Sequence, residues 1–74
     1  MPKHYQLTAI IERERNAYVA LCPELDVASQ GDTIEQAREN LKEALQLFLE
    51  EASSVEIQER LHDEVLITRL DIAV

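Results

Sequence analysis

At 74 residues the chain is long enough for one small domain, residues 1–74, with a core of limited size. Its net charge of −8, from 15 acidic and 7 basic residues, argues against a nucleic-acid-binding surface and fits a basic protein partner, although acidic side chains also serve solubility. The single cysteine excludes an internal disulfide, and no zinc-ligand spacing surrounds it.

The first six residues contain no long apolar run, so we expect neither a signal peptide nor a membrane span. The default location is then the cytoplasm.

The N-terminal half carries the pattern of strands. Residues 4–13 alternate apolar and polar side chains and predict a first strand, with Ile10 interrupting its polar face. A charged turn follows, in which Asn16 suits a positive φ, and residues 17–22 predict a second strand that pairs with the first as a hairpin. Pro23 ends regular pairing because it has no N–H. Residues 25–30 predict a short third strand, which Gly31 terminates in a turn.

Residues 32–52 predict a long amphipathic helix. Apolar side chains recur at spacings of three and four and form one stripe, consisting of Ile34, Ala37, Leu41, Ala44, Phe48 and Ala52 and widened by Leu45 and Leu49. Either Asp32 or Thr33 can act as N-cap, because a Glu or Gln follows each at the third position and completes a capping box. Such a helix is roughly 30 Å long and needs an apolar surface to lie on.

Two readings stay open for residues 55–61: a short second helix capped by Ser53 or Ser54, or an irregular segment. Residues 65–74 alternate again and predict a final strand. The predicted fold class is therefore α+β, with two layers in the order β-β-β-α-β: an antiparallel sheet with one long helix on one face.

A single helix leaves the other face of the sheet uncovered. By alternation, Ile10, Val65 and Ile67 occupy positions that can point to that face, together with Val19 or Leu21. An uncovered apolar face on a small protein marks an interaction surface, and an exposed edge, above all the last strand, can pair with another chain. We therefore expect a homo-oligomer, a dimer or a tetramer.

Three segments carry a family resemblance. They read Asn16-Ala-Tyr-Val-Ala-Leu-Cys-Pro-Glu-Leu25, Ser29-Gln-Gly-Asp-Thr-Ile-Glu-Gln-Ala37 and Asn40-Leu-Lys-Glu-Ala44. In this combination the chain resembles the HicB-like antitoxins over roughly residues 5–50, and the last strand matches more loosely. The resemblance implies a partial ribonuclease-H-like fold of the same element order. It also implies an antitoxin that binds a small basic RNA-cleaving toxin of the HicA type and blocks its active surface.

Two departures from the family pattern limit what is carried over. Many members have a Leu-Pro-Gly-Cys segment where this chain has Leu25-Asp26-Val27-Ala28. Full antitoxins add a C-terminal DNA-binding domain, which these 74 residues do not hold, so operator binding is not expected. The predicted partner-binding residues are the loop acids Glu24 and Asp26 and the apolar Ile10, Val65 and Ile67. The alternative function is an orphan domain that self-associates, with a structural or regulatory role and no toxin.

An enzyme is not expected. Ribonuclease-H chemistry needs carboxylates clustered around divalent metals, whereas the acids here fall at strand ends, in loops and on the helix's solvent side, which is typical of solvated surface acids. Asp63, Glu64 and Asp71 are interpreted in the same way. Cys22 ends an apolar strand and reads as a small buried hydrophobe, with neither His4 nor His62 brought to it by sequence. No cofactor, metal or nucleic acid is therefore predicted.

Overall fold

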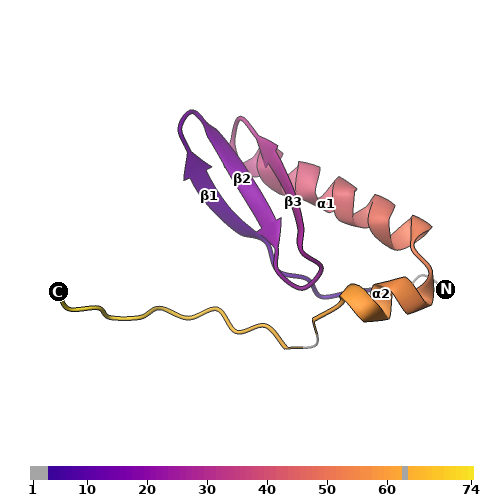
Figure 1. Cartoon of the computed structure of the whole chain (residues 1–74). Coiled ribbons are helices and arrows are strands. Elements are labelled where there is room, and N and C mark those ends of the chain that lie inside the picture. The colour runs from indigo at the N-terminus through magenta and orange to yellow at the C-terminus, as the bar shows by residue number, and fades with distance from the viewer. Residues whose placement is uncertain (1–3, 63) are drawn as a thin grey trace.

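The computed structural model describes residues 4–62 and 64–74, and over these residues it confirms the predicted α+β class. An antiparallel sheet in the order β1-β2-β3 is covered on one face by the long helix α1, and a short helix α2 packs at one end (Figure 1). The elements are β1 (Ile10–Glu14), β2 (Ala17–Cys22), β3 (Val27–Gly31), α1 (Ile34–Glu51) and α2 (Ser54–Arg60).

The predicted hairpin forms, but its first strand begins later than expected. β1 pairs with β2 from Ile10 opposite Leu21 to Glu14 opposite Ala17. Residues 4–9 are not a strand, because β2 ends at Cys22 and the chain turns away, which leaves them no neighbour for ladder hydrogen bonds. The positive φ of the turn falls on Arg15, at 58°, and not on Asn16 as predicted.

Gly31 does not form the predicted turn but has another structural role. It is the last residue of β3 and its φ is not positive. A Cβ at this position would lie 2.5 Å from the backbone nitrogen of Ala37 and 2.8 Å from the carbonyl carbon of Gln36. Glycine is needed here because the end of β3 touches the first turns of α1 directly.

The start of α1 is fixed by side-chain caps. Thr33, rather than Asp32, is the N-cap, and its Oγ1 accepts a hydrogen bond from the backbone N–H of Gln36 at 3.0 Å. The Gln36 side chain in turn accepts from the backbone N–H of Asp32 at 2.6 Å. Together they satisfy two donors at the helix start, as a capping box does, except that Gln36 accepts from the residue before the N-cap and not from the N-cap itself.

The core lies between α1 and the inner face of the sheet. The fully buried side chains are Ala20, Cys22, Leu25, Ala37 and Leu41, and partly buried ones pack around them, among them Leu7, Ile11, Val27, Leu45 and Phe48. The predicted stripe of α1 is thus confirmed at its centre, whereas its first member, Ile34, is 49% exposed. Of the two residues considered for β3, Val27 faces the core and Ala28 is exposed.

The segment left open by sequence is a helix. α2 is capped by Ser53, whose hydroxyl accepts from the backbone N–H of Glu56 at 3.1 Å. Arg60 anchors its other end: the guanidinium donates to the Leu25 carbonyl at 3.0 Å and lies over the Phe48 ring, 4.8 Å from the centroid. The His62 N–H then donates to the Glu24 carbonyl at 2.8 Å. These contacts fix the place from which the C-terminal part of the chain leaves the body.

The predicted final strand is not part of this sheet. Residues 64–74 form no helix or strand within the described chain and run away from the body in an extended path (Figure 1). A strand requires a neighbour for its backbone hydrogen bonds, and alternation alone does not supply one. The radius of gyration is 14.2 Å, against roughly 11 Å for a compact chain of this length.

We expect Gly31→Ala to lower the free energy of unfolding by about 1–3 kcal/mol, because the new methyl group forces the backbone of α1 to shift. Gln30→Ala, at the exposed neighbouring position, introduces the same side chain and should change stability by no more than about 0.5 kcal/mol. Urea denaturation measures both. Equal stabilities for the two variants would mean that α1 does not need this close approach.

Candidate interaction surfaces

The face of the sheet opposite α1 is open and largely apolar. Ile10, Val19, Leu21 and Ala28, with Glu12, line a hollow of about 190 Å³, and we call these five residues the outer sheet face. The strand register explains the cluster, because Ile10 pairs with Leu21 and Leu21 pairs with Ala28, so their side chains share one face. The sequence pattern predicts Ile10 and either Val19 or Leu21 on this face, and the structure places all three there. Val65 and Ile67, predicted for the same face, are not part of it.

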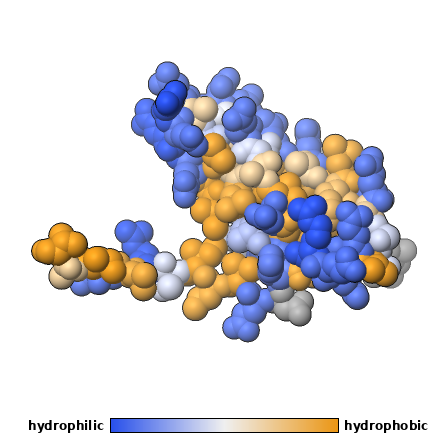
Figure 2. Space-filling model, viewed as in Figure 1, coloured by the Kyte–Doolittle hydropathy of each residue, from blue (hydrophilic) through white to orange (hydrophobic). Residues whose placement is uncertain are grey.

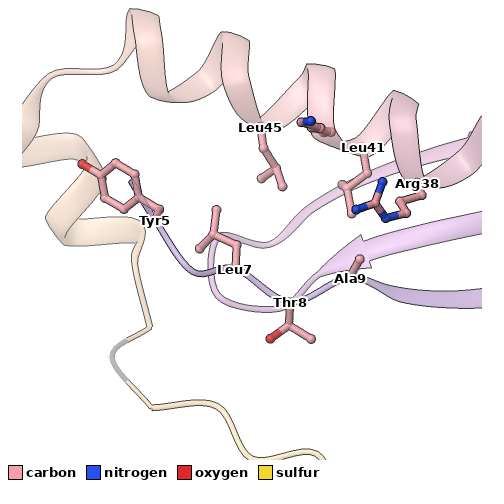
Figure 3. Close-up of a pocket in the computed structure, with 8 residues that line it drawn as sticks. Tyr5, Leu7, Thr8, Ala9, Arg38, Leu41 and Leu45 are labelled. Carbon is pink, nitrogen blue, oxygen red and sulfur yellow. The ribbon is translucent and has the colours of Figure 1, made fainter. Parts of the chain in front are cut away.

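A second open surface lies beside β1. Residues 5–9 run along the side of α1, and the two segments enclose a groove of about 320 Å³, the helix–edge groove. Leu7 points towards Leu45 across it, and Tyr5 lies near one end (Figure 3). The groove exists because α1 packs mainly on β3 and β2 and touches β1 at few positions. Its lining residues are Tyr5, Leu7, Thr8, Ala9, Arg38, Leu41, Lys42 and Leu45.

Glu24 serves the fold rather than presenting a free charge. Its carboxylate accepts from the Thr8 N–H at 2.9 Å and from the Thr8 hydroxyl at 2.5 Å, and so ties the segment before β1 to the turn between β2 and β3. Partial burial on its own raises the pKa of the Glu24 carboxyl, but the hydrogen bonds from Thr8 outweigh this and hold the pKa below its usual value of 4.5.

Cys22 is a buried free thiol, as predicted. Its Sγ donates to a Glu24 carboxylate oxygen at 3.4 Å. Burial raises the pKa of the Cys22 thiol, and the hydrogen bond and charge of Glu24 act in the same direction. The thiolate is therefore disfavoured, which is the opposite of what a nucleophile needs.

The five predicted partner-binding residues do not form one surface. Ile10 belongs to the outer sheet face, and Asp26 is exposed in the turn before β3, at a φ of 56°. Glu24 and Val65 line a separate hollow, together with His4 and His62 among others. Ile67 is 56% exposed on the C-terminal segment. Sequence reasoning missed the structural use of Glu24, because its partner Thr8 is 16 positions away and no local pattern links them.

Two other features are absent from the described residues. In residues 4–62 and 64–74, no three His, Cys, Asp or Glu side chains are placed to share a metal ion. No helix in the same ranges has the length and apolar content that crossing a bilayer requires. Asp63 lies outside the described residues.

These features define a small α+β domain whose sheet has an open face and an open edge at β1. The chain is 52% identical over 48 residues to a UPF0150 protein of Synechocystis sp., a match that covers 62% of this chain and 67% of the relative. A UPF0150 protein of Thermotoga maritima is 45% identical, with 70% and 75% covered, and one of Helicobacter pylori is 38% identical, with 69% and 72% covered. The protein belongs to the UPF0150 family. No protein-family model and no solved structure matches the chain.

Glu24 should make stability depend on pH. Its pKa is lower in the folded than in the unfolded chain, so its contribution is complete well above pH 4.5 and is lost as the pH falls through the folded value. We expect Glu24→Gln to lower the free energy of unfolding at pH 7 by about 1–3 kcal/mol. The difference from the wild type should shrink as the pH falls below 4.5.

The matched control is Glu50→Gln, which removes one carboxylate from the exposed surface of α1 and should cost no more than about 0.5 kcal/mol. Denaturation curves over a pH series measure both variants. A Glu24→Gln difference that stays constant with pH would show that the carboxylate charge is not what holds Thr8.

Proposed function

We propose that this protein is a non-enzymatic, cytoplasmic antitoxin-type domain that binds and neutralises a small basic RNA-cleaving toxin of the HicA type. The proposal combines the HicB-like resemblance of residues 16–44 with a negatively charged chain that leaves an apolar sheet face open. Charge of opposite sign accelerates encounter with a basic protein, and apolar contact supplies affinity once the two have met.

The observation that carries the proposal is the outer sheet face. Ile10, Val19 and Leu21 are only half-buried, although Val19 and Leu21 lie on the central strand β2 and Ile10 pairs with Leu21 from β1. Glu12 borders them and adds a carboxylate that a basic partner can pair with. A surface of this kind fits a protein better than a small molecule, because its hollow of about 190 Å³ is smaller than the roughly 300–1,000 Å³ of a typical ligand pocket.

The residues that carry the HicB-like resemblance are better explained by the fold than by contact with a toxin. Several of its residues have structural parts: Cys22 and Leu25 are in the core, Gly31 permits the contact with α1, and Thr33 caps the helix. Among the motif residues, the side chains that would touch a toxin are therefore those on the open surfaces, such as Val19 and Leu21.

The test is inhibition of RNA cleavage by a HicA-type protein encoded in the same genome. We expect one equivalent of the chain to stop cleavage, and Val19→Lys on the outer sheet face to weaken inhibition at least tenfold, by about 1.4 kcal/mol or more. Asp26→Lys tests the predicted acidic turn without disturbing the Glu24–Thr8 contacts.

The control is Leu47→Lys, which adds the same charge at a 58% exposed position on α1. It should inhibit as the wild type does, and thermal melting should show all three variants folded. Undiminished cleavage in the presence of excess wild-type chain would refute the antitoxin role. Inhibition unaffected by Val19→Lys would move the contact away from the outer sheet face.

A further inference from the structure

The C-terminal segment, Val65–Val74, has the alternating sequence pattern of a strand. It pairs with no other strand in the described chain. Leu66, Leu70, Ile72 and Val74 alternate along it and are between 71% and 124% exposed. Figure 2 shows this segment as a largely apolar arm projecting from the body. An extended run of aliphatic side chains with unpaired backbone is the usual template for pairing with another strand.

The chain has a larger solvent-accessible surface than a compact domain of the same mass. Its accessible area of 6470 Å² exceeds by about 1,800 Å² the roughly 4,700 Å² expected for a compact chain of 8.5 kDa. A stable dimer of standard size buries about 800 Å² per partner. The excess is therefore large enough to be the unburied half of an interface.

The body offers the complementary part at the β1 edge. β1 has β2 on one side and no strand on the other in the described chain, and the helix–edge groove runs beside it. Leu7, Leu41 and Leu45 present apolar surface there, where α1 does not cover the sheet. At the opposite edge, the Asn40 side-chain amide already donates to the Gln30 carbonyl of β3, at 2.7 Å.

The direction of the C-terminal segment favours pairing with a second molecule over pairing with its own sheet. The Arg60 and His62 hydrogen bonds to the carbonyls of Leu25 and Glu24 fix where it begins, and from there it runs away from its own sheet (Figure 1). A strand of ten residues reaches roughly 33 Å, enough to lie along β1 and the residues before it in a neighbouring molecule. Because edge and strand occur on the same chain, two copies can exchange strands reciprocally and close a symmetric pair.

We propose that residues Val65–Val74 of one copy add as a fourth strand to the β1 edge of a second copy, so that each protomer's sheet and helix–edge groove are completed in trans. This surface is distinct from the outer sheet face. The inference therefore does not rest on the proposed antitoxin role.

The test is the mass of the purified full-length chain in solution, measured by light scattering during size-exclusion chromatography. For the wild type we expect a mass of two chains of 8.5 kDa each, or of a larger even number of chains. For Leu70→Glu we expect the mass of a single chain, because the substitution places a charge on the apolar face of the strand. Thr68→Pro removes one ladder N–H without adding charge and should have the same effect. Leu47→Glu, an equally charged change at an exposed site on α1, should leave the mass unchanged.

Hydrogen exchange identifies the edge. In the wild type, the amides of residues 66–74 and the outward amides of β1 should be protected together, and Leu70→Glu should remove both protections while β3 keeps its own. A monomer, with or without a protected segment, would overturn the proposal, since a protected monomer has closed its own sheet. A dimer that survives both Leu70→Glu and Thr68→Pro would overturn it equally, as would protection that Leu70→Glu removes from β3 and not from β1.

Discussion

The close approach of Gly31 to the first turns of α1 is the constraint on which the rest of the structure depends. With no side chain at Gly31, the end of β3 meets the backbone of Gln36 and Ala37, and Thr33 caps the helix two residues further on. This sharp junction sends α1 back over the strand that precedes it. Ala37 and Leu41 are consequently buried against the sheet, and the core forms between them and the inner side chains of β2. A larger residue at position 31 would lift the helix from the sheet at the point where both are most tightly held.

The direction of α1 decides which surfaces stay open. The helix lies over β3 and β2, so it covers little of the inner side of β1 and leaves the opposite face of the sheet uncovered. The helix–edge groove lies where α1 does not cover β1, and Ile10, Val19 and Leu21 are accessible on the face opposite α1. Apolar surface of this extent has a cost in water, which a partner removes. The two separate openings leave room for the two proposed contacts, one with a second copy of the chain and one with a protein of opposite charge.

The C-terminal segment shows how a short chain can hold more apolar sequence than it buries. Its alternating side chains match a sheet edge, yet its anchored start at α2 directs it away from the body. Small domains gain little net stability from their own cores, and assembly is a common way to add to it. Glu24 illustrates the opposite case, because a charge that looked available for a partner is already engaged by Thr8 within the fold.

The sequence by itself determined the features that depend on near neighbours: β2 with its predicted bounds, the start and inner stripe of α1, and the place of Ile10 on the outer sheet face. Each follows from alternation, helical spacing or a cap within a few residues. The tertiary structure decided what depends on distant partners: that β1 begins only at Ile10, that Glu24 holds Thr8, and that Val65–Val74 pairs with nothing in its own sheet. A strand exists only where another backbone lies beside it, and no local pattern states where that backbone will be.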